Sequence, residues 1–153
     1  MGEKFEPLNP AFEAAVRESF GRQGAMAHLG AELLAVAPGH VEIGLPFRPE
    51  VSQQHDYFHG GIAATIADSA GGYAAYSLMP AGANVLTVEF KISLMAPARG
   101  ERLVARGRVK RPGRTLTVTE VDVWAVADGV ETLCATMLQT LICLPPDGAR
   151  GRD

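Results

Sequence analysis

The chain has 153 residues, of which 47% are hydrophobic and 20% charged, so it is long and apolar enough for a single globular domain. A formal net charge of −3 and an aromatic content of 7% argue against a nucleic-acid-binding protein, which is usually basic and stacks bases on aromatic rings. Cys134 and Cys143 lie about 30 Å apart along one extended stretch, too far for a disulfide. We therefore expect a reduced, cytoplasmic protein, and we expect no metal site because no cysteine or histidine spacing suits one.

The chain opens with a predicted helical segment over residues 1–27. Asn9 suits an N-cap, Pro10 suits the first helical position, and apolar residues recur every four positions from Phe12 to Phe20. Residues 29–37 and 41–45 are then predicted to form strands, separated by a Pro-Gly turn. Residues 47–58 combine a proline, charges and two adjacent glutamines without periodicity, and are predicted to form a loop.

Residues 60–79 form a long, weakly charged run that is rich in alanine and glycine. The length would suit a membrane span, but the glycines, serines and Asp68 favour a helix that is buried within the protein. Four predicted strands follow, at residues 86–94, 102–110, 115–127 and 132–144. Strict alternation in the first of them places Leu86, Val88, Phe90, Ile92 and Leu94 on one face and Thr87 on the other. In the third, a change of apolar phase predicts a bulge or a strong bend near Thr119 and Glu120.

This order of elements predicts an α+β fold in which a curved antiparallel sheet wraps around one long central helix. The sheet domain is expected over residues 28–145, and residues 146–153 are expected to be a disordered tail. Because the outer face and the edges of such a sheet need cover, we expect the chain to form a homo-oligomer.

Asp68 is the only charged residue between His59 and Met79. A buried carboxylate is costly unless it is paired or used chemically, so Asp68 is the first candidate for a catalytic residue. The alternative is a structural role, in which Asp68 bonds to backbone groups or to a subunit partner such as Ser69.

The sequence His59-Gly60-Gly61 lies where the long helix begins, so that free N–H groups and the positive end of the helix dipole could form an oxyanion hole. An ordinary helix start is the alternative. Asp68 follows Gly60 by eight residues, or about 12 Å along a helix, whereas a general base must come within about 3 Å of the reacting group. Both groups can reach one carbonyl only if Gly60 of one chain meets Asp68 of another. The sequence therefore predicts a site shared by a homodimer, with Gly71 and Gly72 allowing close helix contact.

Seven of the 14 basic residues lie between Arg99 and Arg114. Within this stretch Lys110, Arg111 and Arg114 form a basic turn that suits phosphate groups, although a solvated face is an equally good interpretation. Arg106 and Arg108 are expected to pair with Glu89 on a neighbouring strand.

Other polar residues could contribute to the chemistry. Gln53, Gln54, His55 and His59 flank the helix start and could orient a thioester or a water molecule, and Thr87 could touch the substrate. Each could equally be a loop, cap or strand residue. A serine or cysteine nucleophile is not expected, because there is no Gly-x-Ser-x-Gly motif and no histidine next to either cysteine.

The stretch QQHDYFHGGIAATIAD, from Gln53 to Asp68, resembles the signature of the phenylacetic-acid-degradation-type (PaaI-like) hotdog thioesterases. The stretches LTVEFKI from Leu86 and Gly113-Arg114-Thr115 are also similar, and the resemblance extends over residues 28–145. It implies a hotdog fold and the hydrolysis of an acyl-CoA thioester to free acid and CoA, without a metal or organic cofactor. It also implies a homodimer, commonly paired into a homotetramer.

The resemblance further implies roles for single residues. The N–H of Gly60 would polarise the thioester carbonyl, and Asp68 of the opposite subunit would act as general base or nucleophile. His59 matches the motif histidine, Gln53 a residue near the water or thioester, and Thr87 a residue that assists the acid. Gly61, Lys110, Arg111 and Arg114 are placed at the CoA. Asp56 departs from the pattern, because many relatives have glycine there.

Two other functions remain open from the sequence. A hotdog hydratase or dehydratase would use His59 and Asp68 on an enoyl or hydroxyacyl thioester, and a non-catalytic module would only bind acyl-CoA. Aromatic and medium-chain acyl groups are both compatible with the sequence.

Overall fold

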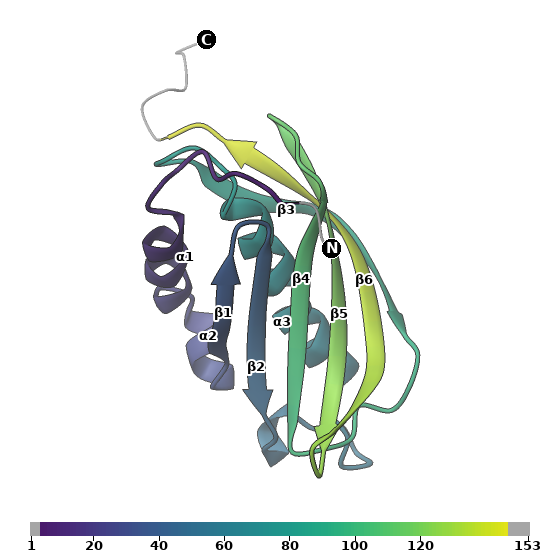
Figure 1. The fold of residues 1–153 in the computed structure, drawn as a ribbon. Helices are drawn as coiled ribbons and strands as arrows, with labels where there is room; N and C mark the ends of the chain where they lie inside the picture. The colour runs from purple at the N-terminus through teal and green to yellow at the C-terminus, as the bar shows by residue number, and fades with distance from the viewer. Residues whose placement is uncertain (1–3, 147–153) are drawn as a thin grey trace.

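The computed structural model describes residues 4–146 and consists of one curved sheet with a long helix packed on it (Figure 1). Six antiparallel strands run in the order β1-β2-β4-β5-β6-β3. The sheet encloses α3, which confirms the predicted α+β hotdog architecture. The elements are α1 (Phe12–Gly21), α2 (Gly24–Leu29), β1 (Glu32–Ala37), β2 (His40–Pro46), the short 3-10 helix η1 (Pro49–Val51), α3 (Gly60–Tyr76), β3 (Asn84–Leu94), β4 (Arg102–Arg111), β5 (Leu116–Ala127) and β6 (Val130–Leu144). Residues 147–153 of the predicted tail lie outside the described residues.

The N-terminal segment contains two helices where the sequence predicted one. Asn9 does accept a hydrogen bond from the Ala11 N–H at 3.0 Å, but α1 begins only at Phe12. The unpredicted helix α2 includes Leu29, which we had assigned to a strand, and β1 begins at Glu32. Gly30 ends α2 with a φ of 75°, a left-handed conformation that glycine adopts without strain. A short apolar run has no period that separates the end of a helix from the start of a strand, which explains the error.

The long helix begins at Gly60, as predicted, and ends at Tyr76 rather than Met79. Its middle lies directly on the sheet, since a Cβ atom at Gly107 of β4 would be 2.5 Å from the carbonyl oxygen of Ala70. Gly71 also faces the chain's own sheet, where a Cβ atom would be 2.0 Å from Oε1 of Gln139. Gly71 therefore serves the contact between helix and sheet, and not the helix contact between subunits that we expected of it. Within residues 4–146, no helix combines the length and apolar character needed to cross a membrane.

A β-bulge in β3 changes which side chains face the helix. The pairing with β6 shifts between Thr87 and Glu89, so that Thr87 lies opposite Leu141 and Phe90 lies opposite Gln139. Both partners are buried beneath α3, and residues directly opposite each other in an antiparallel pair share a face. Thr87 and Phe90 are thus on the helix-facing side, and Leu86 is on the outer side. The predicted alternation was wrong here, because an extra residue reverses the phase.

The bulge predicted near Thr119 and Glu120 of β5 is absent from the structure. Thr117, Thr119, Val121 and Val123 all point inward and are buried, so the phase of β5 is unbroken. The irregularities lie in the neighbouring strands, between Val109 and Arg111 of β4 and opposite Val123 and Trp124 in β6. The sequence pattern misled us because two of the inward positions carry threonine.

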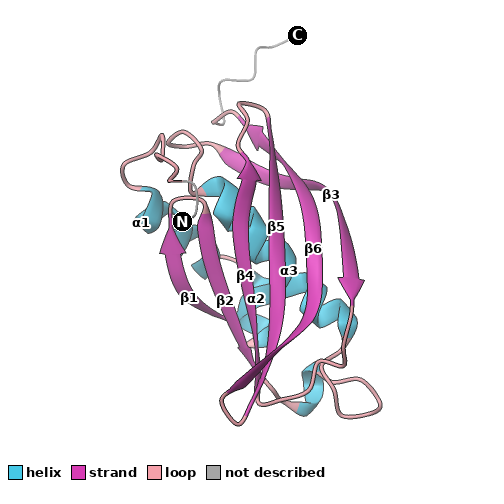
Figure 2. Ribbon diagram, turned by 45° about the vertical axis from the view of Figure 1, so that its right-hand side comes forward, coloured by secondary structure: helices cyan, strands magenta, loops and turns pink. Residues whose placement is uncertain are grey.

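The strand β3 forms one edge of the sheet (Figure 2), and several of its apolar side chains are exposed. The exposed fractions are 58% for Leu86, 53% for Val88, 43% for Phe90 and 60% for Leu94. A long apolar edge strand is usually covered by another chain or element in a native protein. This edge is therefore a candidate subunit interface.

Candidate active site

The carboxylate of Asp68 is held at one oxygen and open at the other. Asp68 projects from the middle of α3 and is partly buried. Its Oδ1 accepts hydrogen bonds from Oγ1 of Thr87 at 2.6 Å and from Nε2 of Gln139 at 2.5 Å. Among residues 4–146, no donor bonds to Oδ2. This oxygen is accessible at the surface of the chain and not buried without a partner. The arrangement fixes the carboxylate and leaves Oδ2 free to accept a proton or attack a carbon atom.

A pocket of about 240 Å³ lies beside Asp68 and has a polar floor. Within the chain, the hydroxyl of Ser69 donates to Oε1 of Gln23 at 3.1 Å. The amide of Gln23 in turn donates to the Tyr73 hydroxyl at 2.9 Å, and Ser19 lies 3.1 Å from the same hydroxyl. The N-terminal segment therefore contributes side chains to the surroundings of Asp68, which the sequence did not indicate.

At the start of α3, one N–H group is left without a partner. His59 caps the helix, because its Nδ1 accepts from the N–H of Gly61 at 2.9 Å and its carbonyl accepts from the N–H of Ile62 at 2.9 Å. Gly61, predicted to contact CoA, has its N–H engaged in this cap. For the N–H of Gly60, no acceptor is found among residues 4–146. Gly60 is therefore the free donor of the first turn, at the positive end of the helix dipole.

A second pocket, of about 470 Å³, lies beside Gly60 and is mainly apolar, with Phe58, Leu94 and Met95 in its wall. Gln53 also lines it, and the Oε1 of Gln53 accepts from the N–H of His55. No acceptor for the amide NH₂ of Gln53 is found among residues 4–146, so this group can serve a ligand.

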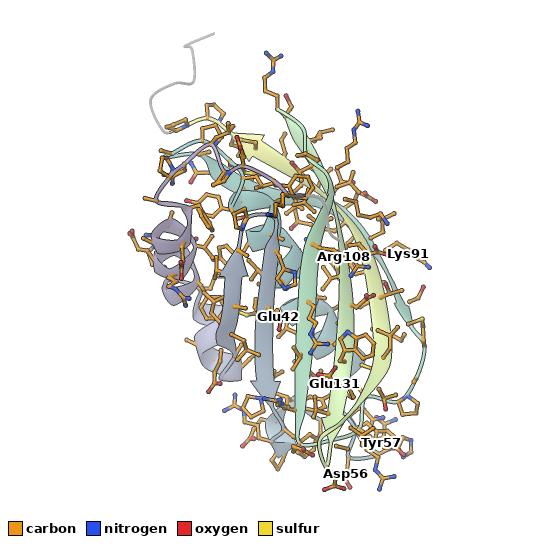
Figure 3. The ribbon with its side chains drawn as sticks, in the orientation of Figure 1. Glu42, Asp56, Tyr57, Lys91, Arg108 and Glu131 are labelled. Carbon is orange, nitrogen blue, oxygen red and sulfur yellow. The ribbon has the colours of Figure 1, made fainter. Side chains whose placement is uncertain are left out.

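The loop before α3 has a tight turn at Asp56 (Figure 3). Asp56 adopts a φ of 60°, and the N–H of Gln53 donates to the Tyr57 carbonyl at 2.9 Å across the turn. Glycine reaches this left-handed conformation freely, and aspartate tolerates it better than most residues do. The departure from the glycine of the family pattern is thus compatible with the same loop path.

The structure does not bring Gly60 and Asp68 together within one chain. They line different pockets, and they are separated by eight residues of a continuous helix, or about 12 Å along its axis. Thr87, by contrast, does reach Asp68, because the bulge in β3 turns it toward the helix.

Three basic residues of β4 are paired with acidic residues of the strands β2, β5 and β6. Arg106 donates to both carboxylate oxygens of Glu131, at 2.6 and 2.9 Å, and Arg108 pairs with Glu120 and Asp122. The expected pairing with Glu89 was wrong, because β3 lies at the far edge of the sheet, away from β4.

The basic turn connects β4 to β5 and lies near the C-terminal end of α3 (Figure 1). Gly60 is at the other end of this helix. Arg114 lines a pocket there together with Leu78 and Met79. Nζ of Lys110 lies 3.0 Å from Oε2 of Glu120, so its charge is already partnered. Arg111 and Arg114 have no ion-pair partner within residues 4–146. Of the three predicted phosphate contacts, these two arginines are the available ones.

The cysteines are poorly suited to nucleophilic chemistry. Burial raises the pKa of the Cys134 thiol above its usual value and raises that of Cys143 as well. Cys134 lines the Gly60 pocket, but its Sγ donates to the Val123 carbonyl at 3.2 Å. Among the described residues, no group of three His, Cys, Asp or Glu side chains is placed to hold a metal ion.

Comparison with known proteins agrees with these features. The model of the thioesterase superfamily matches residues 55–132, which include the helix start, Asp68 and Thr87. A protein of Halobacterium salinarum named as an esterase is 33% identical over 120 residues, covering 75% of this chain and 79% of its own length. Human acyl-coenzyme A thioesterase 13 is 33% identical over 98 residues, covering 63% of this chain and 69% of its own.

Solved structures give the same result. A thioesterase family protein from Silicibacter pomeroyi superimposes with a TM-score of 0.86 and 49% identity, over 87% of this chain and 98% of that one. The PaaI protein of E. coli, from the phenylacetic acid degradation operon, superimposes with a TM-score of 0.78 over 91% of this chain and 97% of its own. Its 17% identity speaks for the fold alone. With the fold, the sequence match and these relatives in agreement, the chain belongs to the thioesterase superfamily, as a thioester hydrolase with the hotdog fold.

Proposed function

We propose that this protein hydrolyses acyl-CoA thioesters to free acid and CoA at an active site that two copies of the chain build together. One copy supplies the N–H of Gly60, and the other supplies the carboxylate of Asp68. One observation carries the proposal. Among residues 4–146 the N–H of Gly60 and Oδ2 of Asp68 have no hydrogen-bond partner, while the helix keeps the two residues in different pockets. The name of the human acyl-coenzyme A thioesterase, a relative at 33% identity, supports acyl-CoA as the substrate class.

The free edge of β3 offers the means of pairing. If two copies join antiparallel along this edge, the sheets become continuous and the two α3 helices run in opposite directions. Gly60 of each helix then lies toward Asp68 of the other. Burial of Phe90 and Leu94, which are 43% and 60% exposed in the single chain, would favour this contact. The assembly has two identical sites, and a homotetramer built from two such dimers stays a prediction.

The reaction follows from the two groups. A water molecule attacks the carbonyl carbon of the thioester while Oδ2 of Asp68 takes its proton. The carbonyl oxygen gains negative charge, which the N–H of Gly60 stabilises by donating a hydrogen bond. The C–S bond then breaks, and the leaving CoA thiolate takes up the proton that Asp68 holds. In the alternative course, Asp68 attacks the carbon directly and water cleaves the resulting anhydride. Thr87 holds Asp68 in either course, and Gln53 contributes its free amide NH₂ to the thioester or the water.

His59 has a positioning role in this proposal, because its ring nitrogen occupies the N–H of Gly61 and leaves that of Gly60 for the substrate. Because Nδ1 of His59 accepts from the Gly61 N–H, the neutral ring carries its proton on Nε2, and neither nitrogen is free to act as the base of a hydratase.

We place the phosphates of CoA at Arg111 and Arg114, with Lys110 at the border of the same patch. In the antiparallel dimer, the basic turn of one copy comes to the same end of the assembly as Gly60 of the other. The apolar wall of the Gly60 pocket, with Phe58 and Met95, suits an aromatic or medium-chain acyl group.

The test is thiol release from a panel of acyl-CoAs, with phenylacetyl, hydroxybenzoyl and short, medium and long acyl groups. We expect turnover by the wild type and loss of nearly all turnover in Asp68→Asn at unchanged folding. Asp122→Asn is the matched control, because it removes a carboxylate from the outer face of β5, away from Asp68 and from the β3 edge. A sample without substrate corrects for the protein's own thiols. An active Asp68→Asn variant would remove Asp68 from the mechanism.

A further inference from the structure

We infer that Gln139 is a positioning residue of the active site, which fixes the Asp68 carboxylate so that Oδ2 is its reacting oxygen. This inference rests on the proposed function, because it concerns the same carboxylate. Gln139 lies on β6, outside residues 55–132 that the superfamily model matches.

The amide of Gln139 is entirely buried, so its donors and acceptor need partners within the protein. Nε2 donates to Oδ1 of Asp68 at 2.5 Å and lies 3.1 Å from the Asp68 carbonyl oxygen. On the other side, Oε1 accepts from the hydroxyl of Thr119 at 3.1 Å. Because a carboxylate only accepts hydrogen bonds, Asp68 fixes which end of the amide faces it.

The hydroxyl of Thr87 closes this network. It lies 3.2 Å from Nε2 of Gln139, from which it can accept, and it donates to Oδ1 of Asp68 at 2.6 Å. Two donors from two strands therefore converge on the same oxygen. Their directions set the rotation of the carboxylate plane, and the second oxygen is turned toward the pocket without a partner among residues 4–146.

The helix is shaped to admit the amide. Gly71 lies over Gln139, and any side chain there would collide, since its Cβ atom would be 2.0 Å from Oε1 and 2.8 Å from Oγ1 of Thr119. The collision at Oε1 is well below the distance of ordinary van der Waals contact, and glycine avoids it because it has no Cβ atom. Thr119, Gln139 and Gly71 thus form one unit behind Asp68, away from the substrate.

Holding a reacting group in its productive direction accounts for much of its efficiency, and a shift of about 1 Å can cost about 100-fold in rate. We therefore expect Gln139→Met, which keeps the volume and removes the amide, to lower kcat by about 10- to 100-fold with KM unchanged. Thr119→Val, which removes the donor behind the amide, lowers kcat by a smaller factor, and Thr119→Ser, which keeps the hydroxyl, restores it.

Thr136→Val is the matched control. Thr136 lies on β6, the strand of Gln139, but its hydroxyl donates to Oδ1 of Asp122 at 2.9 Å, away from Asp68 and from the basic turn. A purely structural role would lower the melting temperature of the Thr136 and Thr119 variants alike without separating kcat from KM. If Gln139→Met does not fold, the three threonine variants carry the test alone.

The outcomes separate this inference from the proposed function. A folded Gln139→Met variant with the kcat of the wild type overturns the inference, and so does such a Thr119→Val variant if Gln139→Met does not fold. An inactive Asp68→Asn variant would still support the proposed function in that case. Turnover by Asp68→Asn overturns both.

Discussion

The N–H of Gly60 can be removed without breaking a hydrogen bond among residues 4–146, which makes its role directly testable. The substitution is Gly60→Pro. Gly60 is the first residue of α3, where proline is well accommodated, and His59 before it has φ −64° and ψ 135°, which a following proline allows. Because the Gly60 N–H has no acceptor within residues 4–146, the folded chain loses no hydrogen bond.

The expected loss is that of a single oxyanion donor, about 100- to 1,000-fold in kcat, or about 2.7–4 kcal/mol of barrier. Proline also adds carbon atoms, and a Cβ atom at Gly60 would lie 2.6 Å from Cδ1 of Leu94. That carbon is the end of a flexible side chain on an exposed strand, so it can move aside. Gly60→Ala brings the same Cβ atom and keeps the N–H, and is therefore the control for crowding.

Thiol release under saturating acyl-CoA gives kcat for the three proteins, and a melting curve checks that each is folded. The ratio of kcat between Gly60→Ala and Gly60→Pro isolates the contribution of the N–H group. Equal kcat for these two variants would refute the oxyanion role of Gly60, whatever both had lost against the wild type.

Two further results are expected. In the first, inactive Asp68→Asn and Gly60→Pro chains are unfolded together and refolded. Half of the dimers are then mixed and each contains one intact site, so about a quarter of wild-type turnover returns. A mixture that stays inactive would mean that both groups act within one chain. Replacing Arg111 and Arg114 by glutamine raises KM for acyl-CoA by about tenfold or more at unchanged kcat, because charge-assisted contacts to phosphate are lost. Arg108→Gln, whose charge is already paired with Glu120 and Asp122, is the control, and an unchanged KM in the double variant would place the phosphates elsewhere.

The parts of the fold that the sequence predicted are those with long, regular patterns. The helix from Gly60 and the four strands after it have enough residues to show which kind of element each is, although the phase of β3 and β5 was misread. The eight-residue separation between Gly60 and Asp68 also needs no tertiary information, because the rise of a helix is fixed.

The parts that it missed depend on contacts between distant segments. A single extra residue in β3 moves Thr87 to the helix-facing side, and strict alternation cannot reveal such a bulge. Strand order decided the partners of Arg106 and Arg108, which the sequence alone leaves open. A signal for Gln139 was available, since it is the polar residue at an inward position between Met137 and Leu141, but its partner Asp68 is 71 residues away.

The open edge of β3 has a consequence for the folded chain before it has formed its dimer. An extended strand with unpaired N–H and C=O groups and apolar side chains is a template for any other extended segment, and charged side chains such as Glu89 and Lys91 are among the means that discourage such pairing. In a newly folded copy, dimer formation at this edge therefore competes with aggregation. The outcome depends on how soon an identical copy arrives. Conditions that slow the meeting of two identical copies, such as low expression, therefore reduce the yield of folded protein as well as its activity.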